Sequence, residues 1–167
     1  PAARAVVPGG PAVNRYPELG TLEPRIAERL GVPAAAVLVT AGGDDALERT
    51  VRAVCAPHRR AIMTTPSYGM IRRFIPLAGA ELVEVPWWRG ELPVDDVLAC
   101  ADPRTALACV VSPNNPTGAA ASRASVARLL EALPRALVLL DQAYVDFAEP
   151  EQDLLELALE HPNAVVV

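Results

Sequence analysis

The chain has 167 residues, of which 51% are hydrophobic and 21% charged, so it can build one packed domain and is not a disordered segment. Its net charge of −5 argues against a nucleic-acid partner held by a basic surface. All 15 basic side chains are arginine, because the sequence contains no lysine. This excludes any mechanism in which the chain itself supplies a Schiff-base or phosphate-binding lysine.

Cysteine and histidine are few and widely spaced. The three cysteines form no CxxC or CxxH pattern, so we expect free, buried thiols in a reducing compartment and no metal site. No apolar run is long enough to cross a bilayer, and no signal peptide is recognisable. The sequence therefore predicts a cytoplasmic protein without a membrane partner. The first residue is Pro1 and the last three are valines, so we expect a piece of a longer protein.

The hydrophobic pattern predicts alternating strands and helices. Residues 1–20 are rich in Pro and Gly and predict an extended arm, and a short helix follows over 22–30. Strands are expected at 37–40, 61–65, 81–85, 106–111, 137–141 and 164–167. Helices are expected at about 44–56, 68–78, 94–101, 122–133 and 151–160. This alternation predicts an α/β fold whose mainly parallel sheet is covered on both faces.

Ligands of such sheets bind where the strands end, so the loops there are the candidate sites. Gly42, Gly43 and Asp44 open the helix at 44–56, where backbone N–H groups suit a phosphate. A tight turn with an Asp cap is the simpler interpretation of this motif alone. Tyr68 follows the strand at 61–65, where its ring can stack on a flat ligand or simply cover the start of the next helix.

Two further loops carry polar side chains. Seven turn-type residues, Ser112 to Gly118, follow a buried strand, which is more than a plain turn needs and favours a binding function. Their Asn115 offers both a donor and an acceptor. Asp141 ends an apolar strand, where a carboxylate needs a cation or strong donors; capping of the next segment is the alternative.

These motifs together resemble a known family. Their order and spacing are similar to those of class I/II pyridoxal-phosphate aminotransferases, and especially of the histidinol-phosphate aminotransferase branch. The matching motifs are Asn14-Arg15-Tyr16-Pro17, Gly42-Gly43-Asp44, Pro66-Ser67-Tyr68, Pro113 to Gly118, and Asp141-Gln142-Ala143-Tyr144.

The resemblance implies a role for each matching residue. Gly42, Gly43 and Asp44 would hold the phosphate of pyridoxal 5'-phosphate. Tyr68 would stack on its ring. Asn115 and Tyr144 would lie at its phenolic oxygen. Asp141 would pair with the pyridine nitrogen and keep it protonated, so that the ring acts as an electron sink. Asp141 and Tyr144 are thus the expected catalytic residues.

The resemblance also implies an architecture and an activity. It implies a three-layer, aspartate-aminotransferase-like large domain over 21–167, incomplete at its C-terminal end, with 1–20 as an N-terminal arm. Tyr16 would reach the partner subunit's site in a homodimer. The parent enzyme would move an amino group between an amino acid, similar to histidinol phosphate, and a 2-oxo acid. The Schiff-base lysine would lie outside this chain, which alone would be inactive.

The chain departs from the family pattern at several positions, which affects the substrate more than the cofactor. The family's Asn, Ser and Glu of the glycine loop, its second loop Tyr and the Glu after the strand-ending Asp are replaced by Ala41, Gly43, Asp45, Ile71 and Gln142. Two alternatives remain open. One is a decarboxylase of the same fold, such as a threonine-phosphate decarboxylase, and the other is a non-catalytic remnant.

Overall fold

The computed structural model describes residue 20 and residues 22–167. Contacts divide the chain into two compact units, one ending at Thr40 and one running from Ala41 to Val167, and each is described by itself. Apart from Gly20, the arm expected over 1–20 lies outside the described residues, and so does Tyr16.

The first unit contains helix α2 (Leu22–Leu30) and the short 3-10 helix η1 (Ala34–Ala36). The strand predicted at 37–40 is wrong, because these residues pair with no strand among those described. The Val39 amide donates instead to Glu23 Oε1 at 3.0 Å, and the Leu38 side chain is 68% exposed. β-branched residues favour a strand only where a neighbouring strand and a packed face exist.

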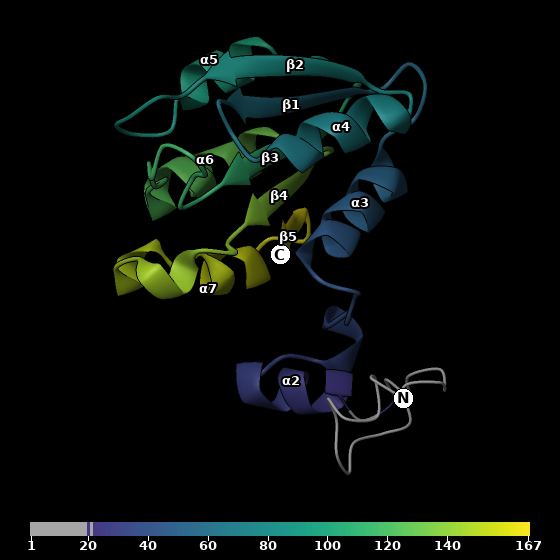
Figure 1. The fold of residues 1–167 in the computed structure, drawn as a ribbon, viewed down its shortest axis with the longest axis vertical. Helices are drawn as coiled ribbons and strands as arrows, with labels where there is room; N and C mark the ends of the chain where they lie inside the picture. The colour runs from purple at the N-terminus through teal and green to yellow at the C-terminus, as the bar shows by residue number, and fades with distance from the viewer. Residues whose placement is uncertain (1–19, 21) are drawn as a thin grey trace, which may run out of the picture. The chain divides into compact units, whose positions relative to one another are not determined.

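The second unit is built on a five-stranded sheet in which every adjacent pair is parallel (Figure 1). The strand order is β2-β1-β3-β4-β5. The strands are β1 (Arg60–Thr65), β2 (Glu81–Pro86), β3 (Thr105–Val111), β4 (Leu137–Asp141) and β5 (Ala164–Val166). The predicted α/β fold with a parallel sheet is confirmed.

Helices cover both faces of this sheet, which gives three layers (Figure 1). One face packs against α3 (Gly43–Val54) and α4 (Gly69–Leu77). The other face packs against α5 (Val94–Ala99), α6 (Arg123–Ala132) and α7 (Leu155–Leu159).

Strand β3 shows why the sequence folds in this way. All seven of its residues are buried, as expected for a central strand with helices on both sides. Leu107 and Cys109 point to the α3 and α4 side, whereas Ala108 and Val110 point to the α5 and α6 side. Alternate residues therefore supply the two halves of the core.

Helix α6 follows its predicted pattern closely. The Ser122 hydroxyl caps its start by accepting a hydrogen bond from the Ser125 amide at 3.2 Å. Val126, Leu129 and Leu130 form its buried face.

The single helix predicted over 151–160 is wrong, because the segment divides into a 3-10 turn, η3 (Pro150–Gln152), and helix α7. The buried side chain of Gln142 causes the break. Its Nε2 donates to the Gln152 carbonyl at 2.9 Å, and its Oε1 accepts from the Leu154 amide at 3.0 Å. Those backbone groups are then unavailable for helical hydrogen bonds.

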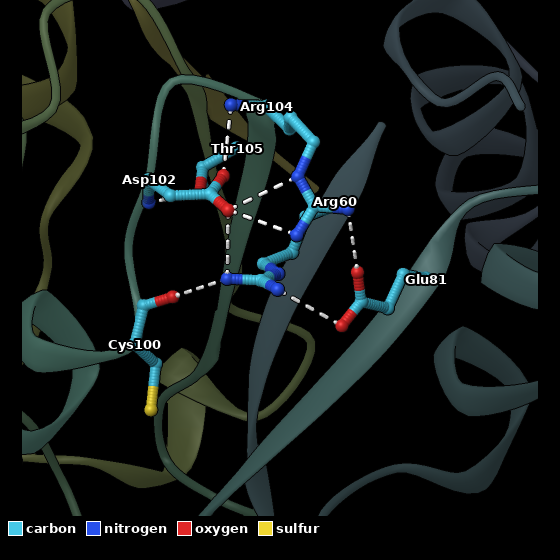
Figure 2. Close-up of polar contacts among 6 residues, drawn as sticks. All are labelled: Arg60, Glu81, Cys100, Asp102, Arg104 and Thr105. Atoms are coloured by element: carbon cyan, nitrogen blue, oxygen red, sulfur yellow. Dashed lines mark hydrogen bonds and ion pairs between the residues drawn. The ribbon is translucent and has the colours of Figure 1, made fainter. Parts of the chain in front are cut away.

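The amino ends of the strands are joined by paired charges (Figure 2). Arg60 lies 3.0 Å from both Glu81 and Asp102 and also donates to the Cys100 carbonyl at 3.1 Å. Arg104 completes the set, at 3.1 Å from Glu81 and 2.9 Å from Asp102. Each carboxylate in this network therefore contacts two arginines.

The opposite, carboxyl edge contains the topological switch point. β2 lies on one side of β1 and β3 lies on the other, so the loops that follow β1 and β3 diverge there. Open α/β sheets bind their ligands at this position.

Candidate functional site

A cavity of about 700 Å³ lies at the carboxyl edge of the sheet, within the second unit. It is lined by Ala41, Gly42, Gly43, Asp44, Leu47, Tyr68, Val111, Asn115, Asp141, Ala143, Tyr144 and Val167. The structure thus brings together seven predicted site residues, namely Gly42, Gly43, Asp44, Tyr68, Asn115, Asp141 and Tyr144.

The glycine loop forms one wall of the cavity. Gly42 is the N-cap of α3 and has a φ of 93°, a left-handed conformation that favours glycine. Asp45, in the first turn of α3, accepts a hydrogen bond from the Ala41 amide at 2.9 Å and another from Arg49 Nε at 2.8 Å. These two bonds lower the pKa of Asp45 and hold the loop against the helix start. Because Gly42, Gly43 and Asp44 at the start of α3 line the cavity, the positive end of the helix dipole faces it.

Tyr68 lies at the start of α4 and is fixed by a contact that the sequence did not indicate. Its hydroxyl donates to Asp44 Oδ1 at 2.8 Å, which joins the loop after β1 to the glycine loop. This hydrogen bond, with the charge of Asp44, raises the pKa of Tyr68. The Tyr68 ring therefore remains a neutral, oriented cavity wall at neutral pH.

Asp141 is the most buried ionisable group of the cavity, with 4% of its surface exposed. Burial raises its pKa, and the nearby charge of Asp44 adds to this effect, although a hydrogen bond from the Ala143 amide at 3.1 Å opposes it. No cation pairs with Asp141 among the residues that the structure describes. A ligand with a positively charged donor would supply the missing partner.

Two residues next to predicted ones were not assigned roles from the sequence. Asn114 is buried and bonds to three side-chain or backbone groups in two loops, whereas Asn115 beside it is half-buried and lines the cavity. Gln142 follows Asp141 and ties the end of β4 to η3 and α7. Their neighbours in the sequence were recognisable. Apart from Thr117, however, the partners of their side chains lie 10 to 48 residues away.

Two parts of the cavity lining favour ligand groups of opposite charge. The start of α3 suits an anionic group, and Asp141 suits a cationic one. Tyr68 supplies an aromatic wall, and Asn115 supplies an amide that both donates and accepts. Their arrangement fits a flat, heteroaromatic ligand that carries a phosphate and a protonated ring nitrogen.

Other chemistries lack support in the described part of the chain. No group of three or more His, Cys, Asp or Glu side chains is placed to hold a metal ion among residues 20 and 22–167. Cys55 and Cys109 are buried free thiols whose pKa burial raises, to about 11 for Cys55. None of the described helices combines the length and apolar character needed to cross a membrane.

The chain is thus an α/β protein with a cavity at the carboxyl edge of its parallel sheet. The family model "Aminotransferase class I and II" matches residues 9–167, and the chain belongs to this family. Enzymes of the family depend on pyridoxal phosphate.

Individual relatives agree with this assignment. The chain is 38% identical over 146 residues to a histidinol-phosphate aminotransferase of Vibrio cholerae, covering 84% of this chain and 41% of that protein. The chain therefore spans less than half the length of this relative.

Two solved structures share the fold. A histidinol-phosphate aminotransferase of Sinorhizobium meliloti in complex with pyridoxal-5'-phosphate has a TM-score of 0.78 at 24% identity, covering 87% of this chain and 40% of that one. An L-threonine-O-3-phosphate decarboxylase of Porphyromonas gingivalis has a TM-score of 0.76 at 27% identity, covering 92% and 48%.

Proposed function

We propose that this chain is the cofactor-binding part of a pyridoxal-phosphate-dependent aminotransferase. The parent enzyme would transfer an amino group between an amino acid similar to histidinol phosphate and a 2-oxo acid. One observation carries the proposal: Asp141, a buried carboxylate that pairs with no cation in the described part of the chain, shares one cavity with the start of α3. The family membership and the Vibrio cholerae relative support the reaction class.

In this proposal, the cavity residues bind and tune the cofactor. The N–H groups at the start of α3, in the loop of Gly42, Gly43 and Asp44, hold the phosphate. Tyr68 packs on the ring. Asp141 accepts a hydrogen bond from the ring nitrogen and keeps its proton in place.

Asn115 and Tyr144 complete the proposed site at the phenolic oxygen of the cofactor. Both line the cavity, and the Asn115 amide can donate to that oxygen in its ionised form. When bound, pyridoxal phosphate supplies a ring that stabilises negative charge at the substrate's α-carbon. A ring nitrogen that Asp141 keeps protonated would strengthen this effect, so Asp141 and Tyr144 are the proposed catalytic residues of the chain.

The parent protein is proposed to be larger than this chain. The chain contains no lysine, so the Schiff-base lysine would come from residues outside these 167. Residues 1–20 would form an arm and 21–167 most of the large domain. Tyr16 would reach the partner's site in a cytoplasmic homodimer.

Binding can be tested without the lysine by titrating the chain with pyridoxamine 5'-phosphate in a calorimeter. We expect saturable binding at one site and a loss of affinity of about tenfold or more for Asp141→Ala. The matched control is Asp96→Ala, an exposed carboxylate of α5. Absence of saturable binding, or equal loss in both variants, would overturn the proposal.

The decarboxylase of Porphyromonas gingivalis supports a second candidate function. Its fold similarity and sequence identity to this chain are comparable to those of the Sinorhizobium meliloti aminotransferase. Both activities would use the same cavity. The complete parent protein distinguishes them: an aminotransferase forms glutamate from 2-oxoglutarate, whereas a decarboxylase releases carbon dioxide from threonine phosphate. The 167-residue chain should do neither, and sustained turnover by it would contradict the external lysine.

A further inference from the structure

Asn114 uses every hydrogen-bonding group of its side chain. It is 3% exposed and lies between the two loops at the switch point. Its Oδ1 accepts from the Ser67 hydroxyl at 2.7 Å, and its Nδ2 donates to the Pro66 carbonyl at 2.9 Å and to Thr117 Oγ1 at 2.8 Å. Only an amide of this size both donates and accepts in this way.

The backbone of Asn114 is equally constrained. Its amide donates to the Ala119 carbonyl at 2.8 Å, and its carbonyl accepts from the Gly118 amide at 2.7 Å. Gly118 has a φ of 71°, which allows the chain to turn back on Asn114. The loop after β3 is therefore closed on itself around this residue.

Two of the partners of Asn114, Pro66 and Ser67, lie in the two positions before the cavity residue Tyr68. Asn114 itself immediately precedes the cavity residue Asn115. The Asn114 amide is therefore a short bridge between the backbone that carries the aromatic wall and the backbone that carries the phenolic-oxygen donor.

We propose that Asn114 is a positioning residue that couples Tyr68 to Asn115 in the cofactor site. It touches no ligand itself, and it acts by fixing the separation of the two loops. This inference rests on the proposed function, since it assumes that Tyr68 and Asn115 contact the same ligand.

Asn163 provides a matched control. Its Nδ2 also donates to backbone carbonyls, those of Leu130, Leu133 and Ala136, but it precedes β5 and does not line the cavity. Asn163→Asp and Asn114→Asp both remove amide donors from a side chain of the same size. Both should lower the melting temperature, but only Asn114→Asp should change ligand binding.

The experiment is a titration of the chain, Asn114→Asp and Asn163→Asp with pyridoxamine 5'-phosphate, followed by calorimetry and by the induced circular dichroism of the bound ligand. We expect Asn114→Asp to lose about tenfold in affinity and to alter the induced signal, with Asn163→Asp within about twofold of the unsubstituted chain. Ser67→Ala removes one of the three bonds and should lose about threefold, which keeps the test valid if Asn114→Asp does not fold.

The outcomes separate the two proposals. If the unsubstituted chain does not bind, the proposed function fails and this inference fails with it. If the chain binds the ligand but Asn114→Asp matches Asn163→Asp in affinity and induced signal, only the positioning role is overturned. Where Asn114→Asp does not fold, Ser67→Ala takes its place in this comparison.

Discussion

Asp102 and Asp141 lie at opposite edges of the same sheet, and their surroundings shift their pKa values in opposite directions. Partial burial would raise the pKa of Asp102, but hydrogen bonds from Arg104 and the charges of Arg104 and Arg60 hold it below its usual range. Burial raises the pKa of Asp141, and no arginine among residues 20 and 22–167 pairs with it to offset this. The amino edge uses its charges to join strands, whereas the carboxyl edge keeps a costly charge that a ligand can neutralise.

The largest expected effect of this contrast is on ligand affinity. Asp141→Asn should weaken pyridoxamine 5'-phosphate binding by about 100-fold, because a desolvated ionic hydrogen bond becomes a neutral one. Calorimetric titration measures this loss. Asp102→Asn should bind as the unsubstituted chain does, and a comparable loss there would remove the distinction between the two edges.

The next effect is on stability and comes from the amino edge. Arg60→Met should lower the free energy of unfolding by about 2 kcal/mol, because Arg60 bonds to two carboxylates and the Cys100 carbonyl with little exposure. Urea denaturation measures the change. The control is Arg52→Met, whose exposed pair with Glu48 at 3.6 Å should be worth less than about 0.5 kcal/mol.

A smaller effect follows from the raised pKa of Asp141. The folded chain favours the protonated form of this carboxyl. The free energy of unfolding should therefore fall as pH rises from about 4, the ordinary carboxyl pKa, to the raised pKa of the folded state. Asp141→Asn should therefore be more stable than the unsubstituted chain at neutral pH and equally stable at acid pH. Melting temperatures measured against pH test this, and a variant less stable at neutral pH would contradict it.

Asp102 should show the reverse pH dependence. Because the pKa of Asp102 is lowered in the folded state, its ionised form stabilises the fold at pH values above about 4, the ordinary carboxyl pKa. This stabilisation is lost as pH falls from about 4 to the lower pKa of the folded state. Asp102→Asn should be less stable at neutral pH, and the difference should vanish in acid. The same melting series measures it, and a pH-independent difference would show that the charge is not responsible.

The smallest expected effect concerns the orientation of the aromatic wall. Tyr68→Phe keeps the ring but removes the 2.8 Å bond to Asp44, so affinity for pyridoxamine 5'-phosphate should fall about threefold. Calorimetry again measures it. A loss as large as that of Asp141→Asn would mean that the hydroxyl, and not the ring, is the main contact.

Local patterns predicted most of the second unit. The strands at β1 to β5 and the cap of α6 depend on buried periodicity and on one capping residue, which a sequence displays directly. The prediction of a strand at 37–40 was wrong because a local sequence pattern cannot show whether a neighbouring strand is present to pair with it. The helix at 151–160 failed because its break depends on Gln142, a residue ten positions before Gln152.

The candidate site was predictable only in part for the same reason. Loops at strand ends identified the cavity residues, since a parallel sheet collects these loops at one edge. The roles of those residues remain predictions. The contact of Tyr68 with Asp44 and the bridge made by Asn114 join segments 24 and about 48 residues apart, and no local signal reports them.

The strand order has a consequence for the time course of folding. β1 and β3 are neighbours in space, but the whole β2 and α5 excursion separates them along the chain. Local turns and helices can form early, whereas the pairing of β1 with β3 must await the closure of this long loop. The cavity therefore exists only once these non-local contacts have formed, so ligand binding reports on the completed fold.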